Sequence, residues 1–365
     1  MDSPVTTGRR TKRKWKTGAA VLAVLLALSG AWLSAYWETI KPAAAGFLYG
    51  MTARRRDQWV DVPEGMTSFS WSGRGVLMAG DGRLCLVDQA GGTRWQTALD
   101  LDEPMICSCG EYAAVYQPGQ DEIWIAGTDG SKRLEIPQGI DGAAIGPDGQ
   151  LAVITAGSGY LTETNLFSPD GIETGRIGLT DSAMAMAVFL PDGALVSCCV
   201  STDGRWRLRI DRAGTCSETD LSPVVVYDLR RCGTGVALWT CDGIAFFDDT
   251  GRETGTFLFR DSELISWDCG DFAAVLLRGQ KNNRLAAVTP EGEVVVFPSN
   301  ARSPVEVAAC GRRVCLLDRE SLLVYDRAGV LLEADACGAR AGHIRSAGQD
   351  LLLLGDGQMR FHAIP

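Results

Sequence analysis

A short glycine-containing turn returns about every forty residues along most of this chain. Successive turns carry glycine at intervals of 39, 41, 43, 37, 41 and 37 residues, each time soon after a hydrophobic segment. The seven glycines are Gly91, Gly130, Gly171, Gly214, Gly251, Gly292 and Gly329. A repeat of this length, with several short strands per unit, is typical of a β-propeller, in which each repeat forms one four-stranded blade around a central channel. The spacing therefore predicts an all-β propeller over residues 58–365.

A second recurring turn indicates the number of blades. It precedes continuous apolar segments such as Leu151–Thr155 and Ala273–Leu277, which are typical of strands buried on both faces. Its eight occurrences end at or next to Gly75, Gly110, Gly149, Gly193, Gly235, Gly270, Gly311 and Gly348. We therefore expect eight blades, with seven as the alternative.

The last repeat has only three strands of its own. Its third strand is expected at Met359–Ile364, and the repeat stops after that strand. Residues 58–63 lie before the first blade and alternate apolar with polar side chains. We expect them to supply the missing fourth strand, because pairing the two ends of the domain closes the ring and removes an exposed sheet edge.

The first 57 residues differ in composition from the rest. Six basic residues within positions 9–16 precede an uncharged stretch over 17–37, which is long enough to cross a hydrocarbon core of about 30 Å. Basic residues on one flank and Trp32, Tyr36 and Trp37 near the other favour a single span with the N-terminus in the cytoplasm and the propeller outside. A cleaved signal peptide is the alternative, since small residues at 29–31 suit a peptidase.

These patterns divide the chain into four parts. We expect a basic cytoplasmic tail at 1–16, a transmembrane helix at 17–37, a linker at 38–57 and the propeller at 58–365. The predicted location is therefore the cell membrane, with one span. Residues 57–365 carry 25 basic and 43 acidic side chains, a balance that argues against nucleic acid as a partner.

Few residues suggest chemistry. Both histidines, His343 and His362, fall in expected strands of the last blade, and the chain lacks the usual motifs for nucleotide binding, serine hydrolysis and zinc. The repeated aspartates before the turn glycines suit turn formation better than calcium binding. We therefore assign no catalytic residue, no metal ligand and no cofactor.

The cysteines follow the repeat. Four of the twelve directly precede a glycine of the second turn, at Cys109, Cys232, Cys269 and Cys310. One structural position in successive blades explains this spacing, because a free cysteine behaves as a small hydrophobic residue. We expect mostly buried thiols, while a disulfide of Cys310 with Cys315, or one involving Cys198, stays open.

The turn at residues 87–95, Val-Asp-Gln-Ala-Gly-Gly-Thr-Arg-Trp, resembles the repeat of quinoprotein-like eight-bladed propellers, of the PQQ and WD40 type. The plan of one N-terminal span and a degenerate propeller is similar to that of membrane-anchored propeller proteins of Gram-positive bacteria. In shape it is also similar to the propeller lipoprotein of outer-membrane barrel assembly, although no lipobox cysteine is present. Such propellers include dehydrogenases, lyases, scaffolds and binding modules, so the resemblance implies the fold and leaves the function open.

One face of the expected propeller is acidic. Loops that join one blade to the next share a face, and binding concentrates in such loops. The candidate acidic mouth consists of Asp100, Asp102, Glu103, Asp141, Asp181, Asp220, Asp261 and Glu263. It suits a cationic partner, although turns are also rich in aspartate for backbone reasons.

The sequence therefore favours a membrane-anchored, extracytoplasmic and non-catalytic interaction platform for an envelope protein or glycan. The alternative is a degenerate quinoprotein-like oxidoreductase, or a propeller hydrolase or lyase that uses channel carboxylates. The two differ in whether acidic and basic side chains meet within hydrogen-bonding reach in the channel.

Overall fold

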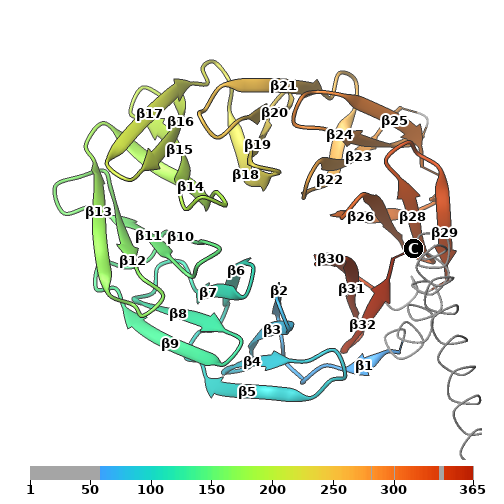
Figure 1. Cartoon of the computed structure of the whole chain (residues 1–365), viewed down its shortest axis with the longest axis horizontal. Coiled ribbons are helices and arrows are strands. Elements are labelled where there is room, and N and C mark those ends of the chain that lie inside the picture. Colours follow the sequence, from blue (N-terminus) through green and yellow to red (C-terminus); the bar gives the residue numbers. More distant parts are fainter. Residues whose placement is uncertain (1–57, 281, 300, 337–340, 365) are drawn as a thin grey trace, which may run out of the picture. The chain divides into compact units, whose positions relative to one another are not determined.

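The computed structural model describes residues 58–280, 282–299, 301–336 and 341–364. These residues form 32 β-strands in eight four-stranded antiparallel sheets, arranged in a ring around a central axis (Figure 1). This confirms the all-β propeller with eight blades and rules out seven. No helix of the described residues is long and apolar enough to cross a membrane. The predicted tail, transmembrane helix and linker lie outside the described residues.

Each of the first seven blades contains four strands that follow one another along the chain. Blade 1 contains β2 (Ser68–Ser72), β3 (Gly75–Gly80), β4 (Arg83–Val87) and β5 (Thr93–Ala98), and blade 2 contains β6 (Met105–Cys109), β7 (Tyr112–Tyr116), β8 (Glu122–Gly127) and β9 (Gly130–Glu135). Blade 3 contains β10 (Gly142–Ile145), β11 (Leu151–Ala156), β12 (Thr162–Phe167) and β13 (Glu173–Leu179). Blade 4 contains β14 (Ser182–Phe189), β15 (Leu195–Ser201), β16 (Trp206–Arg212) and β17 (Thr215–Asp220).

Blades 5 to 7 continue the same order, and blade 8 adds three strands. Blade 5 contains β18 (Val226–Cys232), β19 (Gly235–Thr240), β20 (Gly243–Phe247) and β21 (Glu253–Leu258), and blade 6 contains β22 (Glu263–Cys269), β23 (Ala273–Arg278), β24 (Asn283–Val288) and β25 (Val294–Pro298). Blade 7 contains β26 (Pro304–Cys310), β27 (Arg313–Asp318), β28 (Leu322–Asp326) and β29 (Leu331–Asp335). Blade 8 contains β30 (His343–Ala347), β31 (Asp350–Gly355) and β32 (Gln358–Ala363).

The second strand of each blade holds the ring together because it is apolar on both faces. In β3, Val76 and Met78 belong to a buried cluster shared with blade 8, whereas Leu77 and Ala79 belong to a cluster shared with blade 2. Successive side chains of a strand point to opposite faces of the sheet, so one continuous apolar segment packs against two neighbouring blades.

In blades 1, 5 and 7 the turn before the outer strand is fixed by an aspartate. Oδ1 of Asp88 accepts hydrogen bonds from the backbone N–H groups two and four residues ahead, both at 2.9 Å. Asp248 and Asp326 accept the corresponding pair of bonds in blades 5 and 7. Gly91 completes the first of these turns with φ near 85°, a backbone conformation that favours glycine. These aspartates therefore form turns, as the sequence analysis expected.

The four cysteines that precede a turn glycine occupy one position in the fold. Cys109, Cys232, Cys269 and Cys310 are the last residues of β6, β18, β22 and β26, the innermost strands of their blades. The eleven cysteines of the described residues are free thiols, including Cys310, Cys315 and Cys198. Six of the eleven are buried, and Cys216 and Cys241 are exposed.

Strand β1 (Val60–Asp61) closes the ring. It pairs with β32 as the outer strand of blade 8, with Val60 opposite Met359 and Asp61 opposite Gln358. The amide of Val62 donates to the carbonyl of Gly357 at 2.8 Å. Val60 also approaches blade 1, where a Cβ added to Gly91 would lie 2.1 Å from its Cγ1. One short strand therefore joins the end of the propeller to its beginning.

We predict that Val60→Asp destabilises the whole propeller. A carboxylate at this position would lower the free energy of unfolding by about 2–4 kcal/mol, because Val60 packs against the buried apolar cluster shared by blades 8 and 1. Val330→Asp is the matched control, since Val330 is 56% exposed and the same change should cost less than about 0.5 kcal/mol. Urea denaturation followed by circular dichroism measures both, and equal midpoints would contradict the role given to β1.

Candidate functional site

The innermost strands of blades 1, 2 and 5 to 8 surround a polar cavity in the central channel. The cavity has a volume of about 600 Å³. Its polar and aromatic lining consists of Ser70, Ser108, Asp228, Arg230, Trp239, Ser266, Trp267, Asp268, Glu306 and Arg345. A second cavity of about 280 Å³ adjoins blades 2 to 6 and has mostly small or apolar lining residues. Charged side chains of both signs therefore meet in the half of the channel formed by blades 5 to 8.

Arg230 is the centre of the first group of charges. Its Nε lies 2.9 Å from Oδ2 of Asp228, and its Nη1 lies 3.2 Å from Oδ1 of Asp268. Nη1 also donates to the carbonyl of Trp267 at 2.8 Å, and the guanidinium lies 4.6 Å from the centre of the Trp267 ring. A cation over an aromatic face is a favourable arrangement. Arg230 of blade 5 is therefore bound on several sides, mostly by blade 6.

Asp268 extends this group to blade 7. Its Oδ2 accepts a hydrogen bond from the amide of Ala309 at 2.9 Å. Burial raises the pKa of Asp268, while Arg230 and the Ala309 amide act to lower it. With Arg230 on one oxygen and Ala309 on the other, this carboxyl group links three consecutive blades.

Glu306 plays the corresponding part between blades 7 and 8. Its Oε2 accepts a hydrogen bond from the amide of Ile344 at 2.9 Å, and its Oε1 pairs with Nη1 of Arg345. His343 lies at the edge of this group, with Nδ1 3.5 Å from Oε2 of Glu306. Both carboxylate oxygens are again engaged by the neighbouring blade.

Serine side chains make the equivalent links elsewhere in the ring. Ser70 and Ser108 share a hydrogen bond between blades 1 and 2, and Ser72 donates to the carbonyl of Glu111 at 2.9 Å. Ser266 accepts from the amide of Val307 at 3.2 Å, between blades 6 and 7. These serine links therefore cross blade boundaries, whereas the buried Nε1 of Trp267 has no hydrogen-bond partner among the described residues.

Three cysteines of the innermost and second strands, Cys107, Cys198 and Cys199, are held mainly as thiols by burial. Burial raises the pKa of Cys107 to about 11, and that of Cys199 to about 11. Burial also raises the pKa of Cys198. A thiolate is the form that attacks substrates or binds metals, so these residues suit packing rather than chemistry at neutral pH. Within the described ranges, no three His, Cys, Asp or Glu side chains are grouped to hold a metal ion.

Sequence analysis did not identify the channel charges. Asp228, Arg230, Asp268 and Glu306 lie in the innermost strands β18, β22 and β26, where most other residues are apolar or small. A charged residue in the strand nearest the axis of a propeller is the signal that could have identified them. Contacts among these residues depend on the distances between blades. Those distances cannot be predicted from the sequence of a single strand.

The eight residues of the acidic mouth are exposed and lie in or beside the connections from one blade to the next. Three of them have a partner within the chain. Asp181 lies 3.5 Å from Nη1 of Arg207, and Glu263 lies 3.0 Å from Nη1 of Arg278. Asp220 accepts a hydrogen bond from the amide of Ser222 at 2.9 Å, which lowers its pKa.

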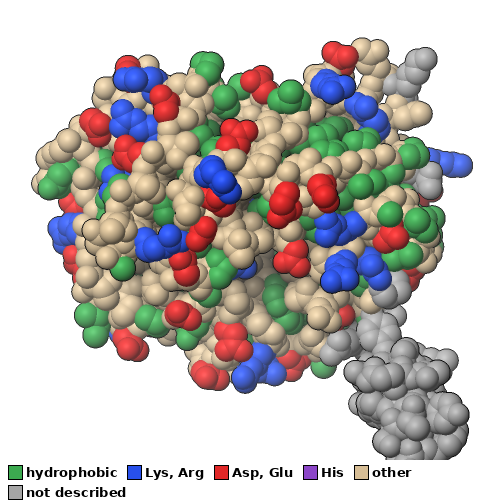
Figure 2. Space-filling view, turned by 45° about the horizontal axis from the view of Figure 1, so that its top comes forward, with side chains coloured by type: hydrophobic (Ala, Val, Ile, Leu, Met, Phe, Trp, Pro, Cys, Tyr) green, Lys and Arg blue, Asp and Glu red, His purple; other side chains and the backbone are tan. Residues whose placement is uncertain are grey.

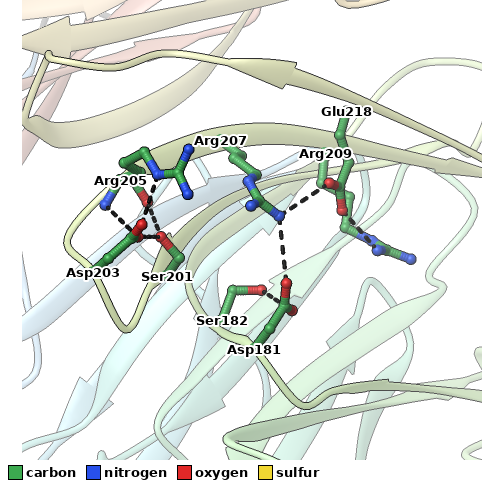
Figure 3. A network of polar contacts seen from close by, with 8 residues as sticks. All are labelled: Asp181, Ser182, Ser201, Asp203, Arg205, Arg207, Arg209 and Glu218. Atoms are coloured by element: carbon green, nitrogen blue, oxygen red, sulfur yellow. Dashed lines mark hydrogen bonds and ion pairs between the residues drawn. The ribbon is translucent and has the colours of Figure 1, made fainter.

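Blade 4 shows how arginines offset the acidic mouth locally (Figure 3). Arg207 lies between two carboxylates, with Nη1 3.5 Å from Asp181 and 3.4 Å from Glu218. Arg209 lies 3.1 Å from the other oxygen of Glu218. Nearby, the Ser201 hydroxyl and Arg205 lower the pKa of Asp203 to about 2. At this blade the acidic charge is therefore largely balanced.

The other five residues of the acidic mouth differ from those of blade 4. They form no ion pair with any Lys or Arg in the part of the chain that the structure describes, and their side chains are open to solvent. These five are Asp100, Asp102, Glu103, Asp141 and Asp261. They come from the connections between blades 1 and 2, 2 and 3, and 5 and 6.

Comparisons with known proteins place the fold in context. Residues 61–200 match the model of a family of unknown function (DUF5711), and no curated protein matches the chain in sequence. The chain is similar to the crystal structure of BamB from Moraxella catarrhalis, with 14% identity, a TM-score of 0.55, and coverage of 85% of this chain and 97% of that chain. It is also similar to apo AztD from Citrobacter koseri, with 11% identity, a TM-score of 0.53, and coverage of 73% and 85%.

A third similar structure is a computationally designed protein, Ika8. Its identity is 15%, its TM-score is 0.59, and the match covers 84% of this chain and all of the designed chain, 100%. At these levels of identity, each likeness concerns the fold alone.

We predict that Asp268→Ala weakens the contact between blades. The change leaves the Ala309 amide without its acceptor and Arg230 with one carboxylate fewer, so the free energy of unfolding should fall by about 1–3 kcal/mol. Asp271→Ala is the control, because Asp271 is exposed in the following turn. Thermal unfolding of both variants measures the difference, and unchanged stability of Asp268→Ala would show that the channel charges do not link the blades.

Proposed function

We propose that this chain is a membrane-anchored, extracytoplasmic interaction platform. Its propeller binds a cationic segment of an envelope protein on the face that carries the acidic mouth, with a glycan as the alternative ligand. One observation carries the proposal: the carboxylates of the channel are paired with neighbouring blades, whereas five exposed carboxylates of the mouth have no described ion-pair partner. These five carboxylates are therefore available to a cationic partner.

The channel network supports a structural role for its own charges. A general acid or base must present an oxygen to the substrate. Asp268 and Glu306 have both oxygens engaged by amides and arginines of adjacent blades. In the oxidoreductase, hydrolase or lyase alternative, these carboxylates would have to act while they hold the contacts between blades. A non-catalytic platform makes no such demand on them.

Exposed carboxylates attract cations over a distance that depends on salt. At physiological ionic strength the screening length is about 8 Å, so several carboxylates on one face act together on a partner that approaches it. Complementary charge raises the association rate and helps to exclude partners of the same sign. The contribution of each single carboxylate at such an exposed site is small, and the proposal therefore concerns the group.

We predict that neutralising the unpaired carboxylates abolishes salt-sensitive capture of the partner. The five changes are Asp100→Asn, Asp102→Asn, Glu103→Gln, Asp141→Asn and Asp261→Asn. The full-length protein, purified in detergent, is used to capture envelope proteins at about 50 mM and about 300 mM salt. Wild type should retain its partner only at low salt, and the variant should not retain it at either concentration.

A control variant removes the same number of charges from the opposite face. The changes are Asp129→Asn, Asp148→Asn, Asp170→Asn, Asp271→Asn and Glu291→Gln, all at exposed turn residues. This control should behave as wild type. Capture that persists in the first variant, independent of salt, would overturn the acidic mouth as the binding surface.

We also predict that residues 1–37 hold the protein in the membrane. The uncharged stretch over 17–37 and its basic flank support this location. A version that starts at residue 38 should leave the membrane fraction on cell lysis, while the full chain stays in it. Recovery of the full chain in the soluble fraction would exclude the uncleaved anchor.

A further inference from the structure

The outer strand of blade 6 differs from every other outer strand of the described propeller. β25 contains no charged residue, whereas β1, β5, β9, β13, β17, β21 and β29 each contain at least one. Val294, Val295 and Val296 are 39%, 41% and 47% exposed. Charged side chains on an edge strand normally prevent it from pairing with another chain. β25 therefore presents an apolar edge without the charged side chains of the other outer strands.

The backbone of β25 has hydrogen-bonding groups directed away from its sheet. β25 is the last strand in the order β22-β23-β24-β25. Glu293 accepts from the amide of Thr289 at 2.9 Å, and Ser299 donates to Asn283 at 3.2 Å, so both face β24. Alternation along an antiparallel ladder then directs the N–H and C=O groups of Val294 and Val296 outward. Pro298, which has no N–H, falls at the next outward position, as expected for a proline on an edge strand.

A groove lies on each side of this edge. Val294 and Val296 line a cavity of about 380 Å³ shared with blade 5, which contributes Leu258 and Phe259. Val295 lines a cavity of about 520 Å³ shared with blade 7. Successive side chains of an added strand would point alternately to the two sides. Main-chain hydrogen bonds to an edge, with grooves for alternate side chains, are the features of binding by strand addition.

The charge of the two grooves is opposite to that of the domain. Arg260 and Arg284 line the groove on the side of blade 5, and three arginines line the one on the side of blade 7. Only two carboxylates accompany them, Glu293 and Asp326, and Oδ1 of Asp326 is used by the turn that follows it. A second copy of this chain would bring the same arginines to the contact, whereas an acidic segment would be attracted to them.

We infer that the edge of β25 binds an extended, acidic segment of a partner protein, which adds to blade 6 as a fifth strand. Apolar side chains of the segment lie against Val294, Val295 and Val296, and its carboxylates pair with the arginines of the two grooves. Figure 2 shows hydrophobic side chains gathered at the upper right of the molecule, on the side where Figure 1 places β25. This surface adjoins the acidic mouth at one residue, because Asp261 lines a cavity of about 510 Å³ with Val296 and Pro298. It selects a partner of the opposite charge.

A short peptide tests the inference on the full-length protein in detergent. The probe is fluorescein-labelled Glu-Glu-Val-Val-Val-Glu-Glu with a blocked C-terminus, and binding is followed by fluorescence polarisation. The same peptide with N-methylated valines cannot donate main-chain hydrogen bonds, and a version with lysine in place of glutamate reverses the charge. Binding should weaken by about tenfold or more with either modified peptide.

Val296→Glu should weaken binding of the unmodified peptide by a similar factor, because it places a carboxylate on the edge. Val296 is partly exposed, so the variant is expected to fold, and its melting temperature checks this. Ile172→Glu is the control, since Ile172 is 66% exposed on blade 3 and the change adds the same charge there.

Three results would overturn the inference. They are equal binding of the N-methylated peptide, binding that Val296→Glu leaves unchanged, and no binding at all. In the last case, sedimentation that shows a dimer of wild type but not of Val296→Glu would assign the edge to a second copy of the chain. The acidic peptide and the cationic partner proposed for the acidic mouth have opposite charges and are measured in separate experiments, so either proposal can fail alone.

Discussion

Packing between neighbouring blades is the interaction on which this structure depends. Each four-stranded sheet has an apolar second strand with side chains on both faces. In β3 of blade 1, Val76 packs in a buried cluster with blade 8, and Leu77 packs in a buried cluster with blade 2. A blade on its own could bury neither face, and a blade at the end of an open row could bury only one, so closing the ring buries both faces of every sheet. The pairing of β1 with β32 supplies that closure and covers the edge that blade 8 would otherwise expose.

The same requirement explains the polar groups of the channel. At the narrow centre of the ring, apolar packing gives way to short links such as Asp268 with Ala309 and Glu306 with Ile344. A buried carboxylate is tolerated only where hydrogen bonds and opposite charge satisfy it, and these links provide both. The charges that meet in the channel therefore stabilise the contacts between blades. The groups that can bind a partner lie at the surface. They are the exposed carboxylates of the inter-blade loops and the outward backbone N–H and C=O groups of β25.

Sequence reasoning predicts local features better than contacts between blades. The repeat spacing gives eight blades, and the turns at Asp88 and Gly91 have the geometry that their residue types imply. The contact of Arg230 with Asp268 could not be predicted, because it depends on the angle and distance between two separate sheets. The position of the β25 valines after the turn at Gly292 predicts an outer strand, as observed, but a short apolar segment does not by itself show that its edge is open.

Zero-length crosslinking tests the central claim most directly. A carbodiimide joins a carboxylate to a lysine only when the two are in contact, and mass spectrometry identifies the crosslinked residues. With the full-length protein and its captured envelope partner, the account predicts crosslinks from Asp100, Asp102, Glu103, Asp141 or Asp261 to lysines of the partner. Crosslinks confined to carboxylates of the opposite face, such as Asp129, Asp170 and Glu291, would contradict it.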